Sequence, residues 1–93
     1  MNQIQGHWVS HDLGFWLCYD ESDGRYVFEA QLNGVCVHGH GLHCGDGFEV
    51  EIGGAWVQTR IEHSSSSTHS HGWYIVSHPN QPLHALPVRK EGA

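Results

Sequence analysis

The stretch FEVEIGGAWVQTRIE, from Phe48 to Glu62, decides the fold of this chain. Its first part alternates strictly between apolar and acidic side chains, which is the period of a half-buried β-strand. The pair Gly53-Gly54 then predicts a tight turn, and the residues from Ala55 onward alternate again. We therefore expect a β-hairpin whose inner face carries Phe48, Val50, Ile52, Val57, Thr59 and Ile61.

Similar short runs lie on both sides of this hairpin. Each run is rich in β-branched or aromatic residues and ends at Gly, Asn, Asp or Pro, as strands commonly do. The expected strands are Phe15–Tyr19, Arg25–Leu32, Val35–Val37 and Trp73–Val76, with turns at Asp20–Gly24 and Asn33-Gly34. Because no stretch has the period of an amphipathic helix, the chain is predicted to be all-β.

The order of elements around the central hairpin resembles that of an SH3-like barrel. Leu42 precedes a Gly45-Asp46 turn, and Trp56 opens the strand after the tight turn. Several short strands joined by tight turns are typical of small barrels, so we predict an SH3-like barrel of five or six short antiparallel strands. The pattern specifies no ligand.

A chain of 93 residues is long enough for one domain and too short for two, so we expect a single domain over 1–93. The segment 63–72 has no apolar residue and is predicted to be a flexible Ser/His-rich loop. The segment 78–93 is rich in proline, which cannot donate to a strand ladder. It is expected to supply no central strand and at most an edge segment near Leu86-Pro87-Val88.

The formal net charge is −6, and the only basic pair, Arg89-Lys90, lies close to the C-terminal end. Such a surface would repel a phosphate backbone, so we expect no direct binding to nucleic acid. A protein with a basic surface is the better partner. No apolar run approaches the roughly 20 residues that span a bilayer, and the first residues are not a signal peptide. We therefore expect a cytoplasmic protein without membrane association.

Three cysteines are an odd number, which favours reduced thiols. Cys18 and Cys36 lie in apolar runs and are expected to be small core residues. Cys44 stands beside His43 with Asp46 nearby, an arrangement that could form a nucleophile. Neighbouring residues of an extended chain point to opposite sides, so His43 is poorly placed to deprotonate Cys44. We expect no catalytic site.

The densest group of metal-binding residue types is His38, His40, His43 and Cys44. In an extended segment His38 and His40 point to the same side, and a bend could bring the other two round to complete a tetrahedral zinc site. Zinc would add folding energy to a small domain. The spacing is irregular, however, and the alternative is a turn at His43 and Cys44 with the other two histidines exposed.

The outward side of the central hairpin is the expected contact surface. It presents Trp56, Gln58, Arg60 and Glu62 on one strand and Glu49 and Glu51 on the other. Tryptophan and arginine are the side chains found most often at interface hot spots. The alternative is that Arg60 only pairs with a neighbouring glutamate and that the segment around Trp8 covers Trp56.

Four stretches resemble a family of small, uncharacterised bacterial proteins associated with mobile elements. They are Tyr19-Asp20 with Gly24–Tyr26, Gly41–Asp46 with Phe48–Val50, Trp56 with Thr59–Glu62, and Trp73–Val76. The Ser/His-rich loop and the Pro-rich end depart from the family pattern. The resemblance implies an accessory protein of a phage, plasmid or integrative element, and it implies no activity.

Together these features favour binding over catalysis. We expect a non-enzymatic module that attaches to a host protein, for example an anti-CRISPR-like inhibitor of a defence nucleoprotein. In that hypothesis Glu49, Glu51 and Glu62 would occupy the basic groove of a nucleic-acid-binding effector. Two alternatives stay open: a zinc-stabilised binding domain built on His38–Cys44, and a homodimeric accessory protein that pairs through an exposed sheet edge.

Overall fold

The computed structural model describes residues 2–3, 14–66 and 70–91. Its strands are β1 (Asn2–Gln3), β2 (Phe15–Asp20), β3 (Arg25–Leu32), β4 (Val35–His38), β5 (Gly47–Ile52), β6 (Ala55–His63), β7 (Trp73–Ile75) and β8 (Pro87–Arg89). A short 3-10 helix, η1 (Ser70–Gly72), precedes β7. Every predicted strand is present, with ends that differ by at most one residue. In the described part of the chain, no helix is long and apolar enough to cross a membrane.

Two of the hairpin turns have the backbone conformation that their residues predict. Asn33 and Gly34, between β3 and β4, have φ values of 53° and 80°. Gly53 and Gly54, between β5 and β6, have φ values of 61° and 82°. Positive φ at both central residues is what a type I′ hairpin requires, and Asn and Gly adopt it at low cost. The local sequence therefore determines the register of both hairpins.

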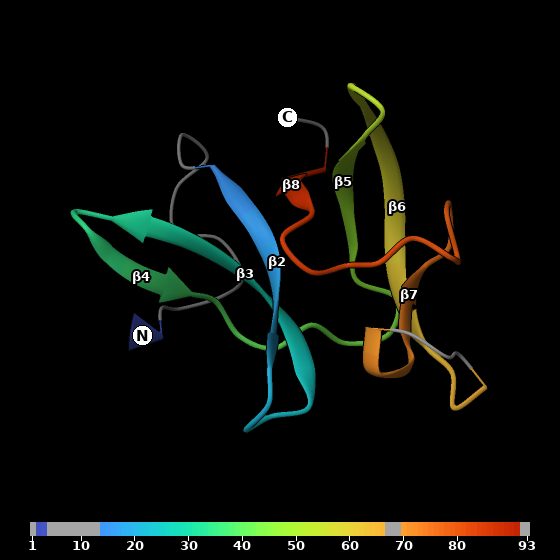
Figure 1. Cartoon of the computed structure of the whole chain (residues 1–93), viewed down its shortest axis with the longest axis horizontal. Coiled ribbons are helices and arrows are strands. Elements are labelled where there is room, and N and C mark those ends of the chain that lie inside the picture. Colours follow the sequence, from blue (N-terminus) through green and yellow to red (C-terminus); the bar gives the residue numbers. More distant parts are fainter. Residues whose placement is uncertain (1, 4–13, 67–69, 92–93) are drawn as a thin grey trace.

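The strands form one sheet in the order β1-β4-β3-β2-β8-β5-β6-β7. β1 runs parallel to β4, and the other pairings are antiparallel. Figure 1 shows β4, β3 and β2 on one side of the molecule and β5, β6 and β7 on the other. The sheet is barrel-like but not closed, because β1 and β7 end it without pairing to each other. The prediction of an all-β domain is confirmed, and the described residues form eight strands instead of five or six.

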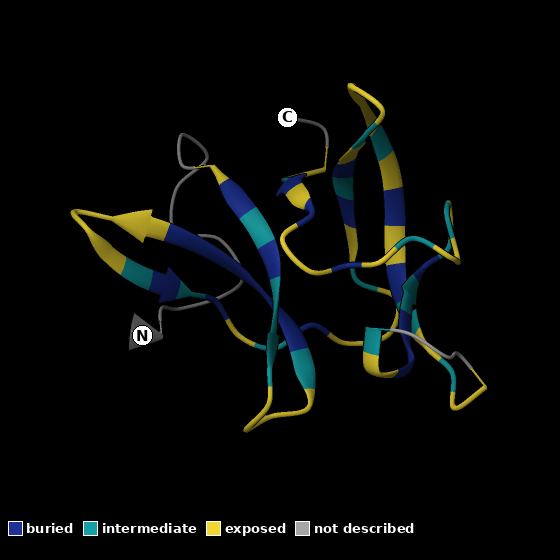
Figure 2. Cartoon of the chain, in the orientation of Figure 1, coloured by how far each residue is buried: buried dark blue, intermediate teal, exposed yellow. Residues whose placement is uncertain are grey.

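The hydrophobic core lies between these two parts of the sheet. Phe28 of β3 meets Phe48 of β5 edge to face, with ring centroids 5.2 Å apart. Buried and exposed bands alternate along β6 (Figure 2), as the sequence predicts for this strand. Thr59 and Ile61 are buried, whereas Val57 is half-buried because it lies near the Gly53-Gly54 turn, at the end of the hairpin.

β8 lies inside the sheet and not at its edge, which corrects the expectation for the Pro-rich segment. Val88 pairs with Phe15 on one side and with Val50 on the other. Pro87 is tolerated because it is the first residue of the strand, where its missing N–H removes little from the ladder. β8 therefore joins the two parts of the sheet into one.

At the open end of the sheet, side chains connect β7 and η1 to the β2–β3 turn. Trp73 Nε1 donates to Gly24 O at 3.1 Å, and Arg25 Cζ lies 5.9 Å from the centroid of the Trp73 ring. His71 stacks on Tyr19 with ring centroids 3.7 Å apart. These contacts hold the two parts of the sheet together where no backbone ladder does so.

The Ser/His-rich segment is folded at both of its ends. His63 is the last residue of β6, and Ser70 Oγ accepts a hydrogen bond from Leu83 N at 3.1 Å. Ser70 and His71 have left-handed φ values of 53° and 56°. Residues 67–69 lie outside the described residues, as does the segment around Trp8 that was considered as a cover for Trp56.

Candidate functional site

The outward side of β8, β5 and β6 carries all six residues predicted as a contact surface, and we call it the outer wall. Those six residues are Glu49, Glu51, Trp56, Gln58, Arg60 and Glu62. The strand register pairs Glu49 with Gln58 and Glu51 with Trp56. Trp56 is 38% exposed, which is unusual for a large apolar side chain in this fold. The structure places these residues on one face; their role in binding stays a prediction.

Sequence reasoning missed Arg89, which organises the outer wall. β8 pairs with β5 so that Arg89 lies opposite Glu49. Arg89 Nε donates to Glu49 Oε1 at 2.6 Å, and Arg89 Cζ lies 4.4 Å from the centroid of the Trp56 ring. The available signal was strand alternation: a residue that follows the apolar Val88 in a strand points outward.

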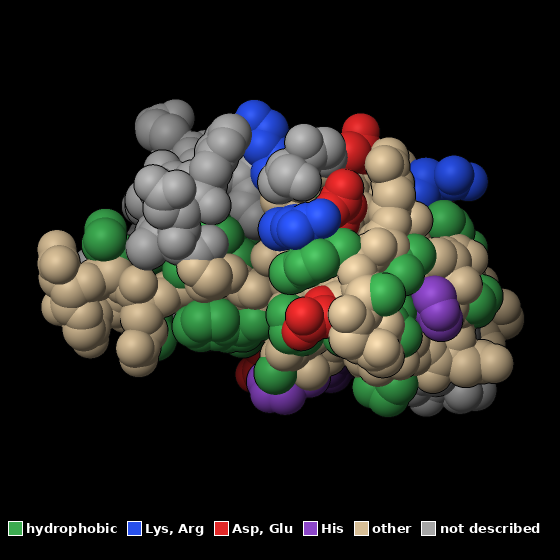
Figure 3. Space-filling model, turned by 90° about the horizontal axis from the view of Figure 1, so that it is seen from above, with side chains coloured by type: hydrophobic (Ala, Val, Ile, Leu, Met, Phe, Trp, Pro, Cys, Tyr) green, Lys and Arg blue, Asp and Glu red, His purple; other side chains and the backbone are tan. Residues whose placement is uncertain are grey.

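The outer wall has mixed charge, and Arg60 pairs with Glu62, as the alternative interpretation of this face held. Arg60 Nε lies 3.2 Å from Glu62 Oε2, and Glu49 is bound by Arg89. These two arginines are half of the four Lys and Arg residues in the whole chain. Seen from above, basic side chains lie beside acidic ones (Figure 3). A purely electrostatic fit to a basic groove is therefore weaker than the sequence suggested.

The structure does not bring His38, His40, His43 and Cys44 together. His38 Nδ1 lies 3.0 Å from Gly39 O, and the other three residues are exposed. Among residues 2–3, 14–66 and 70–91, no three His, Cys, Asp or Glu side chains are placed to hold a metal ion. The residues therefore do not fit a tetrahedral zinc site.

His43 and Cys44 instead lie in a turn, the alternative that the irregular spacing left open. His43 N donates to Asp46 Oδ2 at 2.8 Å, and Asp46 N donates to His43 O at 3.1 Å. The Asp46 carboxylate thus stabilises the turn through the backbone. Asp46 contacts the backbone of His43 and not its ring, so these hydrogen bonds do not orient the ring as a base for Cys44.

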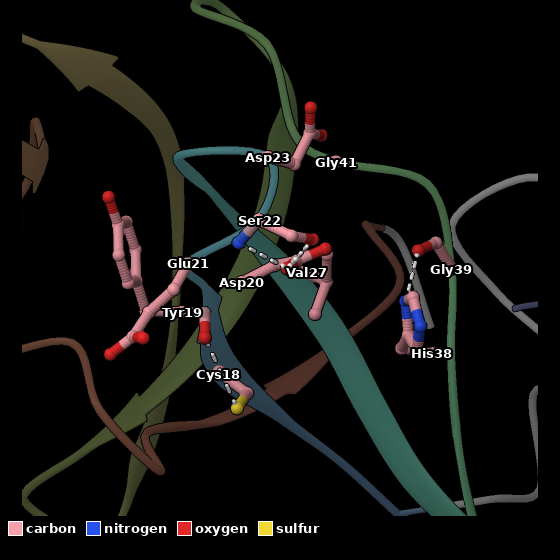
Figure 4. Close-up of a pocket in the computed structure, with 10 residues that line it drawn as sticks. All are labelled: Cys18, Tyr19, Asp20, Glu21, Ser22, Asp23, Val27, His38, Gly39 and Gly41. Atoms are coloured by element: carbon pink, nitrogen blue, oxygen red, sulfur yellow. Dashed lines mark hydrogen bonds between the residues drawn. The ribbon is translucent and has the colours of Figure 1, made fainter. Parts of the chain in front are cut away.

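A hollow of about 690 Å³ opens on the outward side of β2 and β3, between their turn and the segment 38–41 (Figure 4). Its lining includes Cys18, Asp20, Glu21, Asp23, Val27 and His38. None of the described lining residues is Lys or Arg. We call this feature the acidic hollow; its volume is within the range of about 300–1,000 Å³ found for ligand sites.

Hydrogen bonds from Ser22 shape the rim of the acidic hollow. Asp20 Oδ1 accepts from Ser22 Oγ at 2.7 Å and from Ser22 N at 3.1 Å. These bonds, with a smaller effect of nearby His38, lower the pKa of Asp20 below its ordinary value. At Gly41 a Cβ would lie 2.5 Å from Asp23 Oδ2, so a larger residue there would displace the Asp23 carboxylate. The lowered pKa keeps the Asp20 carboxylate ionised at neutral pH.

Glu29 is a buried carboxylate of β3 that was not singled out from the sequence. It lies in β3 between Trp16 and His38, on the outward side of the sheet, and is only 8% exposed. Its Oε1 accepts a hydrogen bond from Trp16 Nε1 at 3.0 Å, whereas its buried Oε2 has no hydrogen-bond partner. A buried carboxylate oxygen without a donor is costly. The only sequence signal was an acidic residue within the apolar run of β3.

Cys18 and Cys36 lie on the outward side of the sheet, which corrects the expectation that they are core residues. Leu17 and Phe28 occupy the core side instead. All three cysteines are free. Burial, and after it the negative charge of Glu29, raises the pKa of the Cys18 thiol. Cys18 therefore carries little thiolate at neutral pH and is a poor nucleophile.

Alkylation with iodoacetamide at about pH 8 should modify Cys44 well before Cys18, because Cys44 is exposed and the raised pKa of Cys18 lowers its thiolate fraction. Peptide mass spectrometry over a time course measures both sites in one sample. In Glu29→Gln, Cys18 should react faster while Cys44 keeps its rate. Equal rates at the two sites in the unmodified chain would contradict this prediction.

Residues 16–90 match the family model described as Domain of unknown function (DUF5348). No curated protein and no solved structure matches the chain. The matched range begins in β2 and ends just after β8. It therefore includes both the outer wall and the acidic hollow.

Proposed function

The chain belongs to the DUF5348 family of domains of unknown function, and we propose that it is a non-enzymatic module that binds another protein through the outer wall. The observation that carries this proposal is the exposed Trp56, held by Arg89, which is itself bound to Glu49. Tryptophan and arginine dominate the binding energy of many protein interfaces.

The arrangement reduces the entropy that binding would cost. Arg89 lies over the Trp56 ring at 4.4 Å, and its bond to Glu49 at 2.6 Å limits its own rotation. Side chains that are ordered before association lose less freedom when the partner arrives. Trp56 therefore presents a rigid apolar surface, with the exposed Gln58 and Glu51 beside it as polar contacts.

The strand framework makes the outer wall itself rigid. β5 and β6 pair continuously from Gly47–Arg60 to Ile52–Ala55, and β8 pairs with β5 on its other side. A face built on paired strands changes little between the free and the bound state. Such a face suits a preformed protein surface better than a flexible peptide.

The placement of the nucleophile candidates supports a binding role over an enzymatic one. The pKa of Cys18 is raised, which disfavours its thiolate. Asp46 accepts a backbone hydrogen bond from His43 and holds the turn that carries Cys44. A thiol with a raised pKa and an aspartate engaged by the backbone are both poorly suited to covalent catalysis, which supports the proposed binding role.

The proposal predicts that a photo-crosslinking residue at Gln58, on the outer wall, captures a protein from host lysate that the same residue at Asn80 does not capture. The captured protein is then purified and titrated by calorimetry against the unmodified domain and Trp56→Ala. We expect Trp56→Ala to weaken binding by about 2 kcal/mol or more, a factor of roughly 30, because the hot-spot ring is removed.

Leu32→Ala is the matched control, because Leu32 is exposed to the same 38% as Trp56 but lies on the β3–β4 hairpin. It should change the affinity by less than about twofold. If Leu32→Ala and Trp56→Ala weaken binding equally, or if both crosslinking positions capture the same protein, the outer wall is not the docking surface.

We also propose a finer role, in which the chain is encoded by a phage or another mobile element and inhibits a host defence nucleoprotein. Its support is the small size, the net charge of −6 and the resemblance of four sequence stretches to accessory proteins of mobile elements. The neighbouring genes test this role: genes of defence inhibitors beside this one would favour it, and a conserved housekeeping operon would contradict it.

A further inference from the structure

We propose that the turn Asn33-Gly34, between β3 and β4, is a site of spontaneous covalent modification, at which the asparagine side chain cyclises and then hydrolyses to aspartate and isoaspartate. The reactants are two neighbouring residues of the chain and solvent water. The turn lies in the part of the sheet formed by β4, β3 and β2, away from the outer wall (Figure 1). The inference therefore does not depend on the function proposed above.

The reaction balances without an oxidant or a reductant. The backbone nitrogen of Gly34 gives its proton to hydroxide and attacks Cγ of Asn33, and the new N–C bond closes a five-membered succinimide ring. The bond from Cγ to Nδ2 breaks, and Nδ2 takes a proton from water and leaves as ammonia. Water then opens the ring at Cγ, which yields aspartate, or at the main-chain carbonyl carbon, which yields isoaspartate. Either product adds one negative charge to the formal net charge of −6.

The residue after the asparagine decides how easily the ring closes. A side chain at this position would crowd the attacking nitrogen, and Gly34 has none. Apart from the chain neighbours of Gly34, no described atom lies within 4 Å of the place that a Cβ would occupy. The exposed Asn80, by contrast, is followed by Gln81, whose side chain stands beside the corresponding nitrogen. Ring closure is therefore sterically free at Asn33 and hindered at Asn80.

The two residues of the turn are exposed and take no part in the strand ladder. Leu32 pairs with Val35 and closes the turn around Asn33 and Gly34. At Asn33 the φ of 53° lies in the left-handed region, which asparagine tolerates better than most residues but not without cost. The attack on Cγ requires rotation of the backbone at Asn33, so the turn has to open first. Its strained conformation and its contact with solvent both lower the cost of that opening.

The end of the β3–β4 hairpin opens without disturbing the core. Leu32 and Val35 are 38% and 45% exposed, whereas Ala30 and Val37, which pair further from the turn, are buried. The tip of the hairpin is exposed in Figure 2 as well. Segments that bury little apolar surface open at a small fraction of the global unfolding free energy. The folded chain therefore reacts, but more slowly than an unstructured peptide of the same sequence.

Conversion changes the hairpin end and leaves the rest of the domain folded. The length and conformation of a two-residue turn fix the register of its strands, and isoaspartate adds one carbon atom to the main chain of the turn. The pairing of Leu32 with Val35 is lost first, because it is the pair next to the turn. A new carboxylate then stands beside two side chains that are among the exposed large apolar ones of the described chain.

The test is an incubation of the full chain in ¹⁸O-labelled water at about pH 8, beside the peptide acetyl-Ala-Gln-Leu-Asn-Gly-Val-amide, which has the sequence of residues 30–35 without the fold. Peptide mass spectrometry follows conversion at Asn33 and, as an internal control, at Asn80. We expect Asn33 to convert at most about thirtyfold more slowly than the peptide, which corresponds to about 2 kcal/mol of local opening, while Asn80 stays intact. Slower conversion at Asn33, or equal conversion at Asn33 and Asn80, would overturn the proposal.

Asn33→Gly is the matched variant, because it removes the reacting amide and keeps a residue that readily adopts positive φ. Its intact mass should stay constant while the unmodified chain gains the mass difference between an amide and an acid. An equal gain in the variant would place the reaction elsewhere and overturn the proposal.

The converted chain carries one additional negative charge, so anion exchange separates it from the unmodified chain. In its ¹⁵N-correlated NMR spectrum the signals of residues 31–36 should shift, whereas those of Phe28 and Phe48 in the core should stay in place. Loss of signal dispersion throughout the spectrum would show that the change is not confined to the hairpin end, and would also overturn the proposal.

Discussion

Trp73→Ala should destabilise the domain by about 3–5 kcal/mol, which is a large part of the stability of a domain of this size. Trp73 is only 5% exposed and belongs to the core. Its Nε1 also donates to Gly24 O at 3.1 Å, and its ring contacts Arg25 and His63. The substitution therefore removes apolar burial and the contact that joins β7 to the β2–β3 turn. Thermal and urea unfolding, followed by circular dichroism, measure the loss.

Trp56→Ala is the matched control, because it deletes the same side chain from an exposed position. It should cost no more than about 1–1.5 kcal/mol, mostly through the lost contact with Arg89. Trp73→Phe keeps most of the apolar volume and loses the bond to Gly24 O, so it should fall between the two alanine variants. If Trp73→Ala and Trp56→Ala unfold at the same denaturant concentration, side chains do not hold the open end of the sheet together.

Val88→Asp should abolish the folded state at ambient temperature. Val88 is buried and pairs with Phe15 on one side and Val50 on the other, so β8 connects the two parts of the sheet. A carboxylate at this position would enter the core without a partner, which costs more than about 4 kcal/mol. Loss of chemical-shift dispersion in a ¹⁵N-correlated NMR spectrum measures the effect.

Val35→Asp makes the same substitution at a valine that is 45% exposed, and should cost less than about 1 kcal/mol. Comparison of Val88→Asp with Val35→Asp therefore separates the effect of the position in the sheet from the effect of replacing valine by aspartate. A well-dispersed spectrum for Val88→Asp would show that β8 is a peripheral strand, as the proline residues suggested, and that the sheet order described above is wrong.

Local patterns in the sequence predicted most of the strands and turns. The alternation from Phe48 to Ile52 and from Ala55 to Glu62 placed the inner and outer faces of the central hairpin correctly. The Asn33-Gly34 turn adopts the positive φ values that such pairs favour. Alternation and turn conformation depend on neighbours within a few residues, so they can be read from the chain without knowledge of the rest of the fold.

The candidate site was only partly predictable for the same reason. The residues of β5 and β6 on the outer wall follow from alternation. Arg89 reaches Glu49 from a strand that lies 40 residues further along the chain, and no local pattern indicates that pairing. The acidic hollow likewise needs the β2–β3 turn and the segment 38–41 to lie side by side. Separate strands build each of these surfaces.

The amino-acid sequence by itself determined the all-β class, the hairpins, the side of each hairpin strand that faces the core and the net charge. The tertiary structure alone decided that β8 lies between β2 and β5 and that Arg89 pairs with Glu49. It also decided that Cys18 and Cys36 face outward, and that the His and Cys residues from His38 to Cys44 form no metal site. The physical reason is the range of the interactions. Turn strain and side-chain alternation act between near neighbours, whereas strand order and charge pairing depend on which distant segments minimise exposed apolar surface and unpaired backbone groups together.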